Sequence, residues 1–187
     1  MIRLLNSQQH YGAVAIAFHW LMALLLIGLV AMGLYMVSLP DAGYDVWKIR
    51  LILVHKELGI LALVIAAPRL LWRFANALPR LVDTLPDWQK VLARFVHLCF
   101  YGLMFALPLT GWVMSSASGI PVSVLGLVTL PDPVGRSDLL FQTYIRLHAA
   151  LAFLLIACML AHIGAAVRHH FFLRDATLKR MLPGSDG

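Results

Sequence analysis

Four long apolar stretches, separated by short polar segments, dominate the pattern along the chain. They run over about 12–37, 49–72, 91–114 and 139–167. Each is longer than the roughly 20 residues that a helix needs to cross the hydrocarbon core of a bilayer. Because the stretches are apolar nearly all round, lipid suits them better than water on any side. The pattern predicts an all-α fold, an integral membrane four-helix bundle, with one membrane domain over residues 1–187.

The connections between the stretches are short and leave no room for a further domain. The longest lies between about 115 and 138, and its middle, 122–130, is apolar but too short to span. We expect this segment to lie on the outer surface or to dip into it as a partial lid. Pro108 should kink the third helix. The first stretch is interpreted as a retained span because it is too long for a signal peptide and contains His19.

Composition and charge support the membrane interpretation and predict an orientation. Hydrophobic residues make up 61% of the chain and charged residues 13%, about half the charged share of a typical soluble domain. If the N-terminus is inside, ten of the 15 basic residues lie on the inner side. That distribution predicts that both termini are cytoplasmic. The net charge of +6 is therefore a topology signal, and we expect no nucleic acid partner.

Histidines carry the candidate chemistry, because an ionisable residue inside a membrane helix is costly and indicates function. His148 and His162 are 14 residues apart on the last stretch, about 21 Å along a helix, and project from nearly the same face. By depth, His19 is level with His162, and His55 is level with His148. A histidine bonded to a neighbouring helix is the plainer interpretation of any single one, but it does not explain the paired depths.

Paired imidazoles at two depths predict two haem b groups. His19 and His162 are the expected axial ligands of the inner haem iron, and His55 and His148 those of the outer one. The core of a helix bundle is a usual place for such cofactors. Iron with imidazole on both sides suits electron transfer better than O₂ binding. The chain contains no Cys-x-x-Cys-His motif, which excludes covalent c-type attachment.

Several short motifs, in order and at their spacing, resemble the bacterial cytochrome b561 family, the small di-haem type that includes superoxide oxidase. They are Phe18-His19-Trp20-Leu21, Val54-His55-Lys56, Arg69-Leu70-Leu71-Trp72-Arg73, His97, Ala106-Leu107-Pro108-Leu109-Thr110-Gly111, Leu147-His148, Ala161-His162 and the tail from Arg174 to Pro183. The resemblance covers nearly the whole chain. It implies the same four haem ligands, a place in the bacterial inner (cytoplasmic) membrane, electron delivery to ubiquinone, and superoxide as a candidate electron source.

The surplus histidine and the inner arginines have competing interpretations. His97 lies at the depth of the inner pair, where packing is favoured over a ligand role or contact with a haem propionate or quinone. It shares a helix face with Tyr101, Met104 and Pro108, a stripe also expected to be packing. For Arg69 and Arg73, interfacial anchoring is favoured over contact with inner propionates or quinone. His169 and His170, just past the last span, are expected to be solvated.

Lys56 directly follows the predicted ligand His55. It either extends to the outer interface or belongs to a positive vestibule that draws in superoxide, which makes it a candidate catalytic residue. The other members of that vestibule would be Lys48, Arg50, Arg136 and Arg146. Four aspartates share this side, so the effect depends on their arrangement.

Two functions fit these residues. In the first, the protein is an oxidoreductase of the superoxide:ubiquinone type, which oxidises superoxide at the outer haem and reduces ubiquinone. In the second, it is a non-catalytic electron carrier, a cytochrome b subunit of a hydrogenase- or dehydrogenase-type complex with a redox protein as donor. Short outer loops and the lack of cysteine clusters count against the second. A non-haem proton relay or metal transporter would leave the paired depths unexplained.

Overall fold

The computed structural model describes residues 3–40, 45–79, 86–124 and 126–182, and four long helices contain most of them. The helices are α1 (Ala13–Ser38), α2 (Val46–Ala75), α3 (Asp87–Ala117) and α4 (Asp138–Arg168). The last continues into a π-helical turn, η1 (His169–Leu173), and a short 3₁₀ helix, η2 (Lys179–Met181), follows. Each of the four is long and apolar enough to cross a membrane. The predicted all-α membrane bundle is confirmed.

Polar caps mark the starts of two helices. The Asp45 carboxylate accepts hydrogen bonds from the backbone amides of Trp47 at 2.8 Å and Lys48 at 3.3 Å, and the Ser137 hydroxyl accepts one from Leu140 at 3.4 Å. Such caps satisfy amides that have no partner inside the helix. Since these first turns are polar, the helices start slightly before the apolar stretches, and α2 begins at Val46 rather than at 49.

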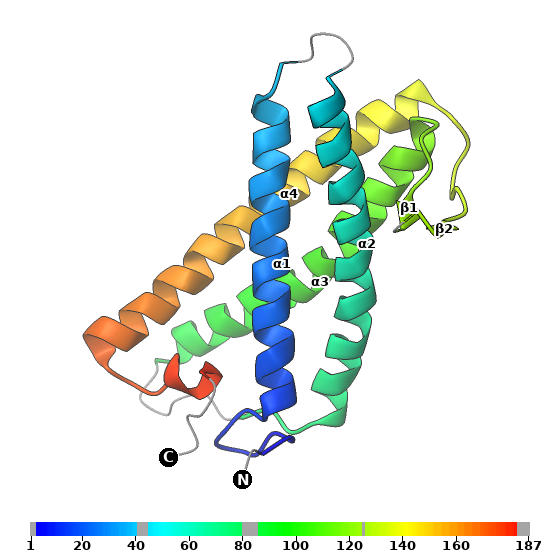
Figure 1. Ribbon diagram of the computed structural model, residues 1–187. Helices are drawn as coiled ribbons and strands as arrows, with labels where there is room; N and C mark the ends of the chain where they lie inside the picture. The colour runs from blue at the N-terminus through cyan, green and yellow to red at the C-terminus, as the bar shows by residue number, and fades with distance from the viewer. Residues whose placement is uncertain (1–2, 41–44, 80–85, 125, 183–187) are drawn as a thin grey trace.

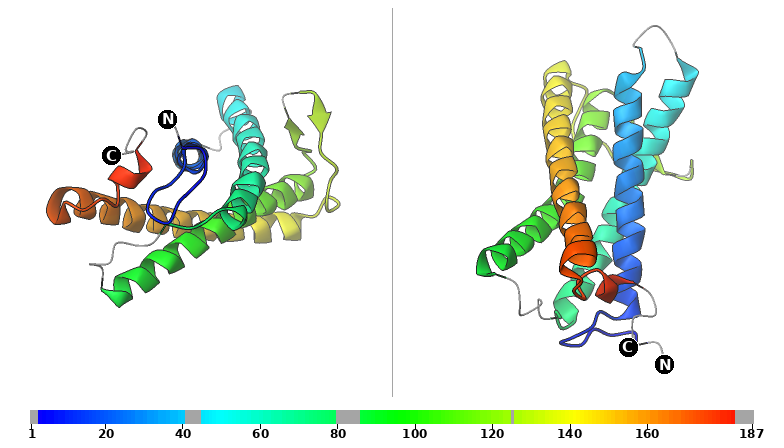
Figure 2. Two further views of the ribbon diagram at one scale, coloured as in Figure 1. Left: turned by 90° about the horizontal axis from the view of Figure 1, so that it is seen from below. Right: turned by 90° about the vertical axis from the view of Figure 1, so that its left-hand side faces the viewer.

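The helices are arranged as two inclined pairs. Packing joins α1 to α2, α2 to α3 and α3 to α4. Figure 1 shows α1 and α2 upright and side by side, with α3 and α4 crossing behind them at a marked tilt. The first and last described residues lie at the same end of the bundle (Figure 2). We call this end the terminal side, and the opposite end the hairpin side.

Small residues let the helices approach closely in the centre. Ala62 and Ala66 on α2 are 1% and 0% exposed, in a cluster with Met22, Leu29 and Met104 from α1 and α3. Helices in membranes commonly use small residues for such contacts, because lipid provides no hydrophobic force that presses the helices together. A second cluster, Leu103, Leu155 and Cys158, joins α3 to α4. The core residues therefore lie on the same helix faces as the histidines.

The connection between α3 and α4 contains a small β-hairpin. Its strands are β1 (Ser123–Val124) and β2 (Val128–Thr129), which pair antiparallel with Ser123 opposite Thr129. The apolar segment 122–130, which the sequence could not assign to an element, includes both strands. β1 contacts α2, so the hairpin lies beside that helix (Figure 1).

Candidate functional site

Two pairs of histidine rings lie opposite each other across the bundle, with ring planes inclined at 54° and 74°. The ring centres of His19 on α1 and His162 on α4 are 6.1 Å apart. Those of His55 on α2 and His148 on α4 are 6.4 Å apart. Because α4 supplies one ring to each pair, the pairs are stacked along the bundle, about 21 Å apart by helix rise. The structure brings together the same residues that were paired on sequence by their depth in the membrane.

The separation within each pair fits an iron atom bound between the rings. Two metal–imidazole bonds of about 2 Å each, plus the distance from each nitrogen to the centre of its ring, give about 6 Å between ring centres. Both pairs have this spacing. Imidazoles on opposite sides of the iron are the axial ligands of a low-spin haem b. The four residues therefore suit two haems of this kind.

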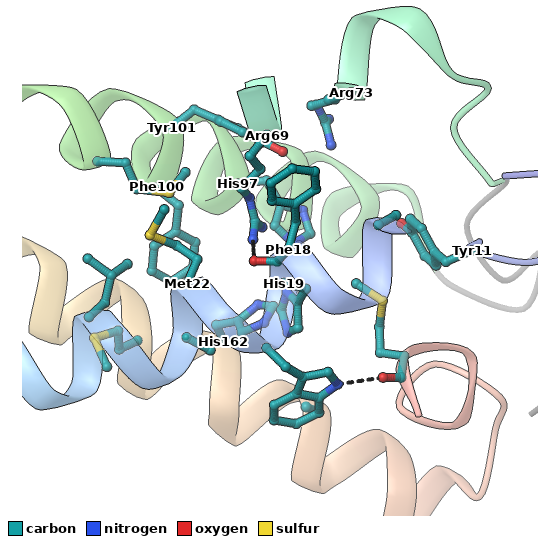
Figure 3. A pocket seen from close by; sticks show the side chains of 18 of the residues that line it. Tyr11, Phe18, His19, Met22, Arg69, Arg73, His97, Phe100, Tyr101 and His162 are labelled. Carbon is teal, nitrogen blue, oxygen red and sulfur yellow. Dashed lines mark hydrogen bonds between the residues drawn. The ribbon is translucent and has the colours of Figure 1, made fainter. Parts of the chain in front are cut away.

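A cavity of about 440 Å³ surrounds the His19–His162 pair on the terminal side. This volume lies within the range of small-molecule and cofactor sites, which are mostly apolar with a few polar groups. Phe100 contacts His162 edge to face, with ring centres 5.5 Å apart, and Met22 also lines the wall. Figure 3 shows the labelled side chains of α1, α2, α3 and α4 converging on this space.

Arg69 and Arg73 border this cavity. The Nη1 atom of Arg69 donates a hydrogen bond of 2.7 Å to the backbone carbonyl of Phe18, the residue before His19 (Figure 3). The guanidinium carbons of Arg69 and Arg73 lie 5.8 and 5.0 Å from the ring centre of Tyr101. Interfacial anchoring was the favoured expectation for both and stays a prediction, and the structure adds that both lie at the cavity wall.

The buried Nε of Arg69 makes no hydrogen bond to a described residue. A buried donor without an acceptor is unfavourable, so an anionic group in the cavity would stabilise this side chain. A haem propionate has the required charge and hydrogen-bonding oxygens. The arginine therefore supplies an independent observation that fits a haem in the cavity.

His97 lines the same cavity and does not form a third facing pair. Its ring centre is 5.4 Å from that of His162, with the ring planes at 69°. The angle between the rings resembles that of His55 and His148, and the shorter distance is what sets this contact apart from the two pairs. On sequence, packing was favoured for His97, Tyr101 and Met104. Met104 and Tyr101 do pack in the central cluster, and all three residues also line the cavity.

On the hairpin side, Thr110 orients His148. The Thr110 hydroxyl donates to the carbonyl of Leu107 at 2.9 Å, and its oxygen lies 3.1 Å from Nδ1 of His148. With the hydroxyl hydrogen engaged by Leu107, Nδ1 is assigned as the donor to Oγ1, an assignment that leaves the lone pair of Nε2 for a metal. Gly111 lies directly beside this ring, because a Cβ there would be in van der Waals contact with it at 3.4 Å.

Thr110 was not singled out on sequence. It belongs to the Leu107-Pro108-Leu109-Thr110-Gly111 motif, but its partner His148 is on another helix, and spacing along one chain cannot show that contact. A threonine–glycine pair just after a proline inside a span was the available signal.

Lys56 follows His55 on α2 and is half-buried. Among the residues that the structure describes, it has no hydrogen-bonding or ion-pair partner. Lys48 donates to the carbonyl of Leu39 at 3.0 Å, whereas Arg136 and Arg146 are exposed. These basic residues all belong to the hairpin-side part of the chain.

The C-terminal segment forms the floor of the cavity. The Trp20 indole donates a 2.6 Å hydrogen bond to the carbonyl of Met181, which lines the cavity. The segment folds back at Arg174, whose φ of 53° is left-handed. His169 Nδ1 lies 2.5 Å from the Asp175 carboxylate. His169 was expected to be solvated, but it is 8% exposed because the returning segment covers it.

Asp175 holds this returning segment together. Its carboxylate accepts a 2.8 Å hydrogen bond from the Thr177 amide, besides its contact with His169. Burial alone would raise the pKa of Asp175, but the bonds from Thr177 and His169 outweigh it and hold the pKa below its ordinary value. The segment is therefore fixed by a charged hydrogen-bond acceptor.

Comparison with known proteins agrees with this geometry. Residues 10–184 match the family described as Prokaryotic cytochrome b561. Cytochrome b561 homolog 2 of Escherichia coli (strain K12) is 35% identical over 177 residues, which cover 95% of this chain and 93% of the relative. Cytochrome b561 homolog 1 of the same organism is 34% identical over 131 residues, which cover 69% and 73%. The Probable superoxide oxidase CybB of Yersinia pestis is 28% identical over 177 residues, which cover 95% and 98%. This chain belongs to the prokaryotic cytochrome b561 family of haem b membrane proteins that transfer electrons.

Proposed function

We propose that this chain is a di-haem cytochrome that oxidises superoxide on the hairpin side and reduces ubiquinone in the membrane. The observation that carries the proposal is the pair of ring separations, 6.1 and 6.4 Å, on one shared helix. Each matches imidazole ligation on both sides of an iron atom. Two such sites in line along α4 provide a path for single electrons across the bilayer.

Each ligand and its neighbours have a definite part. His19 and His162 would hold the terminal-side haem b, and His55 and His148 the hairpin-side one. Thr110 would keep His148 in the tautomer that can bind iron, as its contacts with Leu107 and Nδ1 support. Haem supplies reversible one-electron chemistry of iron when bound. Because each haem would be held by two histidines, a substrate would exchange electrons with it without displacing either ligand.

The electron count balances because each superoxide donates one electron and each ubiquinone accepts two. Each superoxide loses one electron and leaves as O₂. Two such electrons and two protons convert one ubiquinone to ubiquinol. Lys56, half-buried beside the ligand-bearing turn of α2, would attract the anion toward the hairpin-side haem. The name of the Yersinia pestis relative, a probable superoxide oxidase, supports this choice of donor.

The proposed orientation puts both termini in the cytoplasm of a bacterium and the hairpin side outside its inner membrane. Ten of the 15 basic residues would then lie on the cytoplasmic side, as the positive-inside rule requires. Superoxide would approach from outside, and the electrons would leave to quinone within the bilayer.

A second function, electron carrier for a partner redox protein, has one observation in its favour. The two relatives at 35% and 34% identity are named only as cytochrome b561 homologs. Stopped-flow spectroscopy of the purified haem protein, mixed with superoxide with and without a soluble ubiquinone, separates the two functions. The enzyme should show fast haem reduction by superoxide and fast reoxidation by quinone. Slow reduction under all conditions, together with fast reduction by a redox protein, would favour the carrier.

A further inference from the structure

Three apolar side chains of the loop between α3 and α4 are exposed. Residues 119–131 contain no charged side chain. Ile120, Leu127 and Val128 are 52%, 83% and 58% exposed. Figure 1 shows the hairpin folded back alongside α2 instead of projecting beyond the helix ends. Thirteen uncharged residues with an exposed apolar tip would be unfavourable in water.

The backbone of this loop is satisfied by the end of α3. The Ser115 hydroxyl donates to the Ile120 carbonyl at 2.5 Å, and the Ile120 amide donates to the Ser115 carbonyl at 3.3 Å. The Ser116 hydroxyl donates to the Val134 carbonyl and accepts from the Val134 amide. Non-helical backbone can lie at membrane depth only where protein groups supply its hydrogen bonds. The two serines provide them on both sides of the hairpin.

Hydrogen bonds within the hairpin join its own backbone groups, and the base of the hairpin is buried. The Leu130 amide donates to the Val122 carbonyl at 2.9 Å, and the Leu127 amide to the Val124 carbonyl at 3.0 Å. Ser115, Ser116 and Val122 are each 2% exposed. The base is therefore buried in protein while the tip is not. The next charged residues along the chain are Asp132, Arg136 and Asp138.

We propose that this hairpin inserts into the lipid leaflet on the hairpin side, with Leu127 and Val128 among the phospholipid acyl chains. Lipid is the occupant because β1 packs on α2, a membrane span whose own apolar side chains, such as Leu53 and Val64, are exposed. The hairpin thus extends a surface that already faces lipid. Such insertion would reach roughly 5–10 Å below the headgroups. It is independent of which electron donor the protein uses.

Spin-label accessibility measures this directly. Val128→Cys, in a Cys99→Ala/Cys158→Ala background, is labelled with a nitroxide in haem-loaded protein in phosphatidylcholine nanodiscs. Relaxation by O₂, which concentrates in lipid, is compared with relaxation by a water-soluble nickel chelate. Leu160→Cys on α4, 68% exposed within a span, is the lipid reference, and Asp132→Cys is the water reference. Leu127→Cys provides a second tip position if Val128→Cys lacks the haem spectrum.

The label at 128 should resemble that at 160, with O₂ far more effective than the chelate, while the label at 132 shows the reverse. A label at 128 that the chelate reaches as readily as at 132 overturns the proposal. Protection from both reagents, with spin–spin broadening that disappears on dilution with unlabelled protein, would assign the tip to contact with a second copy and also overturn it.

Discussion

Thr110 and His148, on α3 and α4, form a hydrogen bond whose direction is fixed by a third group. Their atoms Oγ1 and Nδ1 are 3.1 Å apart, and the threonine hydrogen already points to the Leu107 carbonyl at 2.9 Å. With that hydrogen engaged, Nδ1 is assigned as the donor, which leaves Nε2 unprotonated. Partners of this kind orient metal-binding histidines and tune the bound metal.

Thr110→Val should weaken haem binding on the hairpin side without removing a ligand. The substitution keeps the shape but deletes the acceptor, and losing such a partner typically costs about 10–100-fold in metal affinity. Haem transfer to apomyoglobin measures the rate of loss, and a redox titration measures the potential. Thr110→Ser is the matched control, because it keeps the hydroxyl and should behave like the wild type. Equal loss in both variants would contradict the orienting role.

The four histidines should group into two pairs by haem loss. We expect about two haem b per chain by pyridine haemochrome assay. His19→Ala and His162→Ala should each remove the same half of the low-spin absorption, and His55→Ala and His148→Ala the other half. Each change deletes one axial ligand and leaves a cavity.

His97→Ala is the control for this grouping, because His97 contacts His162 but has no facing partner at axial spacing. It should retain two haems with a shifted spectrum or potential. If His97→Ala lost a haem and His19→Ala did not, the terminal-side pair would be misassigned.

Superoxide should reduce the haems at a rate that falls with ionic strength. A basic approach path acts over about 8–10 Å at ordinary salt before screening removes it. Lys56→Gln should slow reduction several-fold at low salt while leaving both haem spectra intact, since it alters the approach and not the ligands. Stopped-flow measurement from low to high salt checks this.

Lys179→Gln is the matched control for Lys56→Gln. It removes the same charge from an exposed position on the terminal side and should leave the rate nearly unchanged. Fast haem reduction at a rate that depends neither on ionic strength nor on Lys56→Gln would exclude the attraction proposed for this lysine. It would not contradict superoxide oxidation itself.

Acid should release the C-terminal segment. The folded-state pKa of Asp175 lies below its ordinary value, so the contribution of this carboxylate is complete above about pH 4 and is lost as the pH falls through the lowered pKa. Protection of residues 169–182 from hydrogen exchange, taken relative to the intrinsic exchange rate at each pH, should be high at pH 7 and fall below about pH 4.

Asp175→Asn should exchange quickly in this segment already at neutral pH, because it removes the charged acceptor for Thr177 and His169. Asp132→Asn, on the hairpin side, is the control and should leave the segment protected. Slow exchange in Asp175→Asn at neutral pH would show that other contacts, such as that of Trp20 with Met181, hold the segment.

The sequence by itself determined the spans and the depth of each histidine. A helix rises a fixed 1.5 Å per residue, so the distance of His19 or His148 from the end of its span can be counted along the chain. Depth then paired His19 with His162 and His55 with His148, and those rings do face each other in the structure. Their roles as haem ligands remain predictions.

Only the tertiary structure decided what surrounds those rings. Arg69 lies at the cavity because of how α2 is rotated about its axis, and Thr110 meets His148 because α3 and α4 cross there. His169 is buried because the chain reverses at Arg174. In spans that are apolar nearly all round, hydrophobic periodicity does not specify rotation. Close packing and interhelical hydrogen bonds set it instead, since lipid provides no preference between one apolar face and another.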